Sequence, residues 1–171
     1  WVDRSVYDPS TVERRMGLPS LGMVPFLGRL RKGVAKGRSG LLITSPGTTT
    51  LEADAFRFVR TSLQYASAGR PPRTILVTSA LAQEGKSTVA ANVAIAFAEA
   101  GRRVLLIDGD LKSPSVHRVF GIDKLPGLTD VLTGQRELAD AIQQAPGVAS
   151  LRILPAGPQA PAPVDLLDSA A

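Results

Sequence analysis

The sequence reads Ala80-Leu81-Ala82-Gln83-Glu84-Gly85-Lys86-Ser87-Thr88 in a stretch that matches the phosphate-binding loop (P-loop) pattern, with alanine in place of the more common first glycine. In such a loop, main-chain N–H groups and the positive end of the following helix converge on a phosphate. Gly85 allows the backbone a close approach, the Lys86 ammonium reaches the β- and γ-phosphates, and the Ser87 hydroxyl is a hard ligand for Mg²⁺. We therefore predict that residues 82–88 bind ATP together with Mg²⁺.

The loop lies between an expected strand and an expected helix. Residues 74–78 form an apolar, β-rich run that is typical of a strand buried on both faces, and residues 87–100 repeat apolar side chains at helical spacing. Residues 104–107 indicate a second strand of the buried type. Strand, helix and strand within about 35 residues predict a right-handed βαβ unit. The expected fold class is therefore α/β, with an open, mostly parallel sheet and helices on both faces.

Two acidic residues, Asp108 and Asp110, follow the second of these strands. Ligands of open parallel sheets bind at the carboxyl ends of the strands, so we expect both carboxylates to face the nucleotide. Two acids at this spacing can hold Mg²⁺ directly or through water, and one can accept a hydroxyl proton. Turn formation or capping is the alternative role for such a pair. The phosphate-binding loop one helix earlier favours the functional interpretation.

Further elements are expected on both sides of this unit. Residues 9–17 indicate a short helix, residues 21–24 a short strand, and Thr49-x-x-Glu52 a capping box that opens a helix to about residue 66. The apolar face of that helix is expected to hold Leu51, Ala55, Phe58, Val59 and Leu63. Weaker patterns predict three short helices, a strand and a last helix, at residues 115–120, 127–133, 136–144, 151–154 and 163–167.

The net charge of +5 is concentrated near the N-terminal side of the chain. Residues 1–40 hold eight Lys/Arg and three Asp/Glu, whereas residues 41–171 hold twelve of each. Five of the basic residues fall within residues 29–38, and we interpret them as a basic arm for an anionic membrane surface. A solvated linker without a partner is the alternative. Nucleic acid is not an expected partner, because the rest of the chain is charge-neutral and only 5% of the residues are aromatic.

A longer stretch resembles the second Walker motif of bacterial tyrosine kinases, the cytoplasmic autokinase domains of exopolysaccharide export and chain-length systems. It reads Val104-Leu-Leu-Ile-Asp108-Gly-Asp110-Leu-Lys112-Ser-Pro114-Ser-Val-His-Arg118-Val-Phe120-Gly121. Residues 78–88 are similar to the phosphate-binding loop of that family, and further similar stretches lie at residues 11–19, 126–132 and 154–157. The resemblance extends over nearly the whole chain in the order and spacing of the family.

Carried over position by position, the resemblance implies a set of roles around one nucleotide. Lys86 would bind the β- and γ-phosphates and Ser87 would bind Mg²⁺. Asp108 would act as the base toward a tyrosine hydroxyl and assist the metal, and Asp110 would be a second acid near Mg²⁺. The implied reaction transfers the γ-phosphoryl group of ATP to tyrosines of neighbouring copies and regulates exopolysaccharide synthesis or export.

The resemblance also implies an assembly and a cellular location. Asp54, Arg57 and Arg60 would correspond to the E-x-x-R-x-x-R oligomer motif of the family, and thus to a ring-type homo-oligomer. Residues 1–48 would be a juxtamembrane segment and residues 49–171 a partial kinase domain. The expected location is the cytoplasmic face of the bacterial inner membrane, next to an upstream transmembrane segment or adaptor.

The sequence departs from the family pattern in several places. Ala82-Gln83 replaces the usual Pro-Gly, so a position that tolerates φ > 0 has lost its glycine, and Lys112 replaces an arginine. The chain holds no later apolar strand that ends in Asp (Walker B) and no tyrosine-rich C-terminal tail, so we expect it to be part of a longer kinase domain. The alternatives are a Min/Par-type ATPase, although residues 79–82 lack the early lysine of that class, or a non-catalytic fragment that binds nucleotide and oligomerises.

Overall fold

The computed structural model describes residues 9–24, 42, 47–66 and 71–168. The basic arm expected at residues 29–38 lies outside these described residues. In chain order, the elements of the described part are α1 (Pro9–Met16), α2 (Leu51–Tyr65), α3 (Lys86–Glu99), β1 (Val104–Ile107), α4 (Val116–Phe120), α5 (Leu128–Leu132), α6 (Leu138–Ala141), β2 (Gln143–Gln144), β3 (Leu151–Leu154) and α7 (Pro163–Asp168). None of the helices described is both long and apolar enough to cross a membrane.

The described strands form one sheet in the order β1-β3-β2. β1 and β3 are parallel, with Val104 opposite Leu151 and Ile107 opposite Leu154, and β2 is antiparallel to β3. The ladder continues past the end of β1, because the main-chain N–H of Asp108 donates to the carbonyl of Leu154 at 2.9 Å. The expected strands at residues 104–107 and 151–154 are thus confirmed, and the fold is α/β with a mixed sheet.

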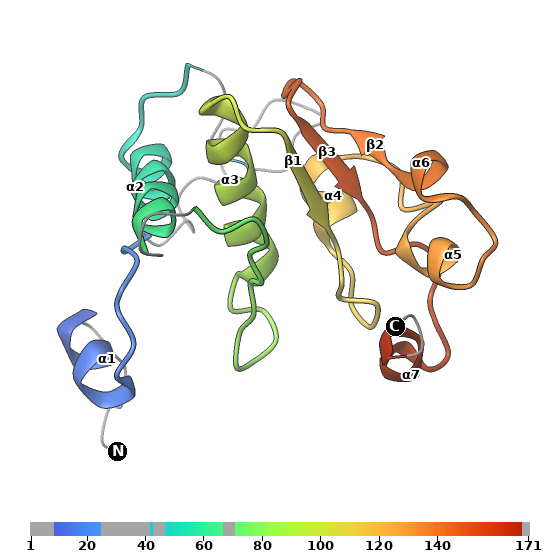
Figure 1. Cartoon of the computed structure of the whole chain (residues 1–171), viewed down its shortest axis with the longest axis horizontal. Coiled ribbons are helices and arrows are strands. Elements are labelled where there is room, and N and C mark those ends of the chain that lie inside the picture. The colour runs from blue at the N-terminus through green and yellow to red at the C-terminus, as the bar shows by residue number, and fades with distance from the viewer. Residues whose placement is uncertain (1–8, 25–41, 43–46, 67–70, 169–171) are drawn as a thin grey trace.

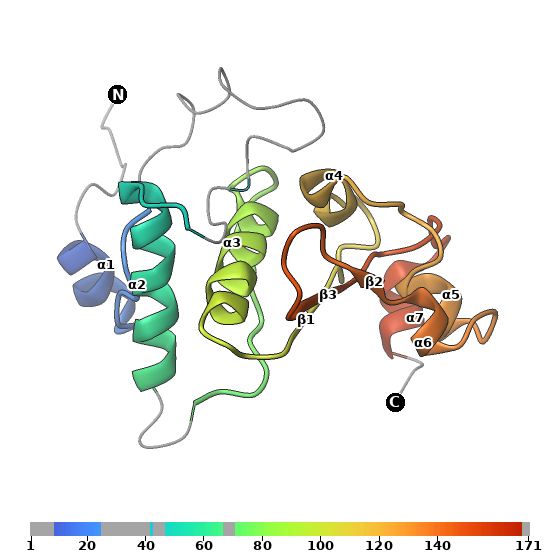
Figure 2. The ribbon, with the colours of Figure 1, turned by 90° about the horizontal axis from the view of Figure 1, so that it is seen from above.

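The main core lies between the sheet and the helices α3 and α4. Figures 1 and 2 show α3 beside β1 and α4 behind the sheet, and both helices contact each other. Small alanine side chains on α3 allow this close packing. The buried residues of the core are Ala91, Ala94, Ile95 and Ala98 of α3, Val116, Val119 and Phe120 of α4, Leu151 and Ile153 of β3, and Ala145 and Val148 between β2 and β3.

Helix α2 packs against α3, as Figure 2 shows, and its buried face agrees with the expected one only in part: Val59 and Leu63 lie in the contact as expected. Phe56 and Val59 are buried against Val93 of α3, whereas Leu51 and Phe58 are 82% and 61% exposed. The helix is apolar over a wide arc, so spacing alone did not distinguish the face toward α3. The expected capping box is also wrong, because the N-cap is the next residue along the chain, Thr50, whose hydroxyl accepts from the N–H of Ala53 at 3.2 Å.

Two of the expected strands are wrong. Residues 74–78 run without a ladder partner in the described part of the chain, and Leu76 is 89% exposed. Residues 21–24 also belong to no described strand; Gly22 instead lies against the side chains of Phe58 and Val59. An apolar run becomes a strand only where a neighbour satisfies its N–H and C=O groups, and no described segment does so here.

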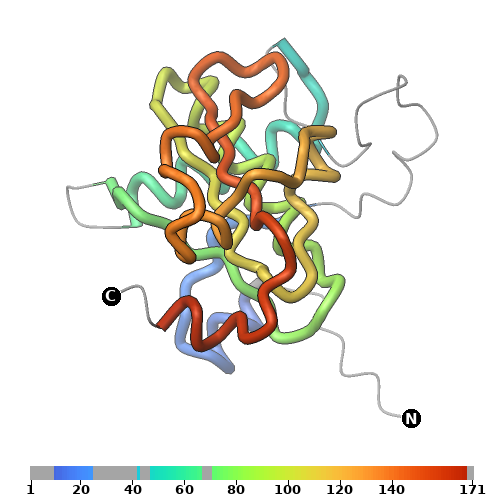
Figure 3. Tube along the Cα trace, turned by 90° about the vertical axis from the view of Figure 1, so that its right-hand side faces the viewer, coloured from blue at the N-terminus to red at the C-terminus, as the bar shows by residue number. Residues whose placement is uncertain are grey.

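The C-terminal part of the described chain, coloured orange to red, lies on the side nearest the viewer in Figure 3. The N–H of Leu128 donates to the carbonyl of Pro155 at 2.7 Å, which ties the start of α5 to the segment after β3. A Cβ on Gly127 would overlap main-chain atoms of Pro155 and Gly157, so this contact requires glycine. Two stretches of the family resemblance, residues 126–132 and 154–157, therefore pack directly on each other.

Candidate nucleotide-binding site

The phosphate-binding loop leads directly into α3, as the sequence predicts. Helix α3 begins at Lys86, and Gly85 is its N-cap in the left-handed region, at φ 90°. Gln83 also has a positive φ, 66°, and it is the one described non-glycine residue that does. The prediction that a φ > 0 position in this loop has lost its glycine is confirmed, and the loop holds its shape at the cost of local backbone strain.

Two hydrogen bonds link residues of the phosphate-binding loop to one another. The Glu84 carboxylate accepts from the N–H of Leu81 at 2.9 Å, and the Ser79 hydroxyl donates to the carbonyl of Leu81 at 2.8 Å. Residues 81–84 are exposed, whereas residues 85–88 are half-buried at the start of α3. The loop is therefore open to solvent on one side and anchored by the helix on the other.

The structure brings the loop and the acids after β1 together. Figure 1 shows the loop before α3 and the loop after β1 at the same end of the molecule. The Lys86 ammonium lies 2.7 Å from the Asp110 carboxylate, and the two side chains are only 33% and 20% exposed. Its bond to Lys86 holds the pKa of Asp110 below the ordinary value, with partial burial opposing this effect. This lysine–carboxylate pair places both charges at the amino end of α3, where phosphate groups bind in such loops.

Asp108 occupies a different environment from Asp110. It is 3% exposed, and its carboxylate accepts from the main-chain N–H groups of Asp110, Ser115 and Val116. Asp108 lies at the carboxyl end of β1, as expected. That its carboxylate faces the nucleotide stays a prediction, because here it is bonded to its own turn. No pattern in the sequence predicts that the Asp108 carboxylate is directed toward its own turn.

The donors present are suited to magnesium that is shared with a nucleotide. In the described ranges, no three His, Cys, Asp or Glu side chains are grouped so that they could hold a metal by themselves. Asp110 and the hydroxyl of Ser87, the residue after Lys86, provide hard oxygen ligands near the amino end of α3. Mg²⁺ in nucleotide sites usually takes one or two protein oxygens and completes its shell with phosphate and water, so these residues fit the ion.

The residues of the expected oligomer motif lie on α2, and both arginines contact α3 of the same chain. The Arg57 guanidinium bonds to Asp54 at 2.9 Å and to Glu99 at 3.2 Å, and these bonds raise the pKa of Arg57. Arg60 donates to the carbonyl of Ala96 at 3.3 Å. Sequence reasoning missed Glu99, since nothing in the helical pattern of α3 indicates which residue meets α2. The role of the motif in oligomer formation stays a prediction.

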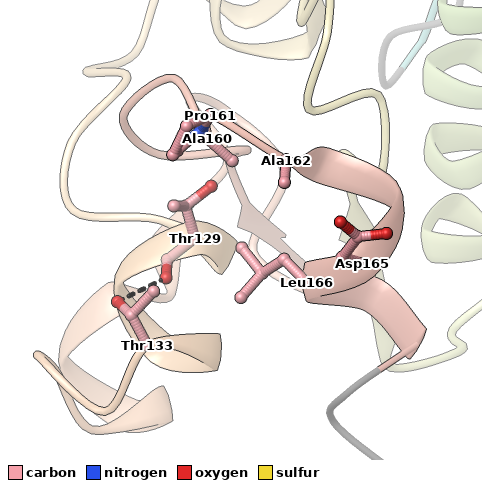
Figure 4. Close-up of a pocket in the computed structure, with 7 residues that line it drawn as sticks. All are labelled: Thr129, Thr133, Ala160, Pro161, Ala162, Asp165 and Leu166. Carbon is pink, nitrogen blue, oxygen red and sulfur yellow. Dashed lines mark hydrogen bonds between the residues drawn. The ribbon is translucent and has the colours of Figure 1, made fainter.

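A separate hollow lies between α5 and α7, next to the segment that follows β3. Figure 4 shows it, with a volume of about 340 Å³ and with Leu166, Thr129 and Ala160 among its lining residues. None of the residues that line it belongs to the phosphate-binding loop or to the turn after β1. Its lining is mostly apolar, and Asp165 is the charged residue among those that line it.

Comparison with known proteins agrees with this geometry. Residues 71–152 match the ParA family model, described as NUBPL iron-transfer P-loop NTPase. Tyrosine-protein kinase YwqD of Bacillus subtilis is 39% identical over 141 residues, which cover 82% of this chain and 58% of the relative.

Solved structures of tyrosine kinase domains are also similar to this chain. The BceF tyrosine kinase domain matches with a TM-score of 0.81 at 33% identity, over 94% of this chain and 66% of that structure. The kinase domain of Escherichia coli tyrosine kinase ETK matches with a TM-score of 0.83 at 26% identity, over 95% of this chain and 65% of that structure.

The loop, the turn after β1 and the α/β sheet define a ParA-like P-loop NTPase domain. More specifically, the chain is a homologue of the bacterial tyrosine kinases and has the fold of their kinase domains. It spans 58% of the length of YwqD and about two thirds of the solved domains.

Proposed function

We propose that this chain is the ATP-binding part of a protein-tyrosine autokinase, which phosphorylates tyrosines of neighbouring copies. The observation that supports it most directly is the 2.7 Å contact between Lys86 and Asp110, which joins the phosphate-binding loop to the acidic turn of the second Walker motif. The homology to tyrosine kinases then favours a tyrosine hydroxyl over water as the acceptor.

In this proposal the chain acts mainly by positioning and charge. Lys86 exchanges its contact with Asp110 for the β- and γ-phosphates, and the main-chain N–H groups of residues 82–88 surround them. Ser87, Asp110 and Asp108 are the residues that the resemblance assigns to Mg²⁺, and the bound ion would neutralise charge on the phosphates. The bond from the γ-phosphorus to the bridging oxygen breaks and a bond to the tyrosine oxygen forms, which yields ADP, phosphotyrosine and a proton.

The setting proposed for this reaction is the cytoplasmic face of a bacterial inner membrane, in exopolysaccharide synthesis or export. Residues 1–48 would be the juxtamembrane segment, residues 29–38 would contact anionic lipid, and residues 49–171 would form part of the kinase domain. An excess of basic residues next to a transmembrane segment is typical of its cytoplasmic side, and the concentration of positive charge in residues 1–40 supports this placement. A ring-type homo-oligomer through α2 completes the proposal.

A Min/Par-type ATPase is the second candidate, and the match of residues 71–152 to the ParA family favours it in part. The same loop and acids would then serve hydrolysis. Residues 79–82 read Ser-Ala-Leu-Ala and lack the early lysine that this class carries in its loop. Tyrosine kinases also match over a longer part of the chain.

Transfer of label from γ-labelled ATP to tyrosine tests the proposal. We expect the full-length protein to label its own tyrosines in the presence of Mg²⁺, and the Lys86→Met variant to lose both labelling and nucleotide binding. Lys112→Met, which removes an exposed lysine from the turn after β1, is the matched control and should retain nucleotide binding. Full-length protein that hydrolyses ATP without labelling tyrosine would overturn the kinase proposal and support the ATPase.

A further inference from the structure

Tyr65, the last residue of helix α2, is exposed over most of its surface. Its exposed fraction is 81%, and its hydroxyl has no hydrogen-bond partner in the part of the chain that the structure describes. A tyrosine that serves packing buries its ring, and its hydroxyl then usually finds a partner. Tyr65 does neither, so packing within the described chain does not account for this side chain.

The side chain of Tyr65 points away from α3, the helix that begins at Lys86. Leu63, two residues earlier on α2, packs against the apolar cluster that includes Val93 of α3. Two residues along a helix correspond to a rotation of about 200°, so Tyr65 lies on the side of α2 opposite this contact. Its hydroxyl therefore cannot enter the phosphate-binding loop of its own chain while α2 packs on α3.

Helices α2 and α3 lie side by side and run in opposite directions (Figure 1). Arg57 contacts Glu99, the last residue of α3. Arg60, about one turn later on α2, contacts Ala96, about one turn earlier on α3. The carboxyl end of α2 is thus directed toward the same end of α3 as the phosphate-binding loop, and two copies that meet at this end can each present Tyr65 to the other. The last turn of a helix also opens at lower free energy than its centre, which lets the tyrosine enter a site on another copy.

No acidic residue lies close to Tyr65 along the chain. Residues 55–83 hold four arginines and neither Asp nor Glu. An acceptor hydroxyl approaches a triphosphate with several negative charges, and carboxylates beside it would oppose that approach. The charge of this segment therefore favours a group that meets Mg·ATP and afterwards carries a phosphate.

We propose that Tyr65 is a phosphoacceptor: a second copy of this chain transfers the γ-phosphoryl group of its ATP to the Tyr65 hydroxyl. This inference rests on the proposed kinase function and assigns one of its substrate groups. The bond from the γ-phosphorus to the oxygen that bridges to the β-phosphate breaks, and a bond from phosphorus to Oη of Tyr65 forms. The hydroxyl proton passes to a carboxylate of the second copy's site and then to water, and ADP leaves.

Phosphopeptide mapping of the full-length protein after incubation with Mg·ATP tests the proposal. Trypsin releases residues 61–73 as one peptide, in which Tyr65 is the one tyrosine. We expect phosphate on Tyr65 in this peptide, assigned from its fragment ions by mass spectrometry. Tyr65→Phe should remove that signal and leave the affinity for Mg·ADP within about twofold of the wild type, whereas the matched variant Tyr7→Phe should keep the signal within about twofold.

The same map separates failure of this inference from failure of the proposed function. Phosphate on other tyrosines of the protein, with Tyr65 unmodified, would overturn the assignment of Tyr65 and leave the kinase proposal intact. Absence of phosphate from every tyrosine would overturn both.

A mixing experiment tests transfer between copies. The Lys86→Met variant serves as acceptor, and the Tyr65→Phe variant serves as the active donor, so a peptide of residues 61–73 that contains tyrosine can come only from the acceptor. We expect this peptide to be phosphorylated in the mixture, at a rate that rises with donor concentration, and to stay unmodified when the acceptor is incubated alone. Phosphate on Tyr65 of the wild type without any in the mixture would overturn transfer between copies.

Discussion

The strained residue in the phosphate-binding loop is Gln83, with φ at 66°. A non-glycine residue in this region costs energy that glycine does not, and the larger unfolded-state entropy of glycine offsets only part of the gain. We expect Gln83→Gly to raise the free energy of unfolding by roughly 0.5–1 kcal/mol and to bind Mg·ADP at least as tightly as the wild type. Denaturant unfolding and calorimetry measure the two quantities.

Gln83→Ala is the control for this prediction, because it removes the side chain and keeps the strained φ. It should change the free energy of unfolding by less than about 0.5 kcal/mol. If Gln83→Gly destabilises the protein, the loop does not hold this residue in the left-handed region in solution.

His117 on α4 makes stability depend on pH. Burial lowers its pKa, the nearby Arg118 and Lys124 act in the same direction, and Asp108 opposes them. Its Nδ1 is buried and has no hydrogen-bond partner among the described residues. The folded protein therefore binds this proton less readily than the unfolded chain, so this contribution to stability is complete above about pH 6.5 and is lost as the pH falls through the lowered pKa.

We expect a plot of unfolding midpoint against pH to fall more steeply for the wild type than for His117→Gln between about pH 7 and 5. Glutamine keeps polar atoms of similar size at this position and cannot take up a proton. Parallel curves for the two proteins would show that His117 has the same pKa in the folded and unfolded states.

At the scale of elements, the contact between α2 and α3 joins a small apolar core to an ion pair. Arg57 and Glu99 meet at 3.2 Å with side chains 27% and 13% exposed, next to buried Phe56. Removal of the arginine leaves a mostly buried carboxylate without its partner, which costs more than loss of a surface pair. We expect Arg57→Ala to lower the free energy of unfolding by about 1–3 kcal/mol.

A double-mutant cycle with Glu99→Ala isolates this pair, and its coupling energy should be about 1 kcal/mol. Asp54→Ala is the matched control: it removes the more exposed partner of Arg57 and should cost less than about 0.5 kcal/mol. The molecular mass of the same variants in solution, measured by size-exclusion chromatography, tests the role of the motif in oligomer formation. If Arg57→Ala changes the oligomer mass and leaves stability untouched, the arginine acts between copies and not within the chain.

At the scale of the whole molecule, the sequence predicted an element correctly wherever a local pattern of residues determines its structure. Residues 104–107 and 151–154 are strands, α3 starts at the phosphate-binding loop, and Gln83 has the expected positive φ. The predictions failed where pairing with a segment far along the chain determines whether a strand forms. Residues 74–78 have a strand composition and no described neighbour, whereas β2, Gln143–Gln144, has no apolar pattern and pairs because the edge of β3 is available.

The candidate site also has features that a local pattern predicts and features that depend on contacts between distant segments. The sequence predicted that both acids after β1 lie near the phosphate-binding loop, because ligands of parallel sheets bind at the carboxyl ends of the strands. Asp110 does lie there, 2.7 Å from Lys86. The orientation of the Asp108 carboxylate depends on how the turn to α4 closes, and spacing does not encode it. Glu99 became a partner of Arg57 only through the packing of two helices.

On one face of the sheet, β1 exposes two apolar side chains in the described part of the chain, beside the exposed Arg152 of β3. Leu105 and Ile107 alternate with half-buried neighbours along β1 and are 43% and 50% exposed. Because they bury little surface, replacing both with threonine, which also favours strands, should change the free energy of unfolding by less than about 1 kcal/mol. It should also reduce self-association, measured by light scattering, since exposed apolar patches promote it.

Ile153→Thr on β3, at a fully buried position, is the control and should lower the free energy of unfolding by about 2–4 kcal/mol. Equal costs for the two sets of variants would mean that in solution the open face of β1 is covered as completely as the core.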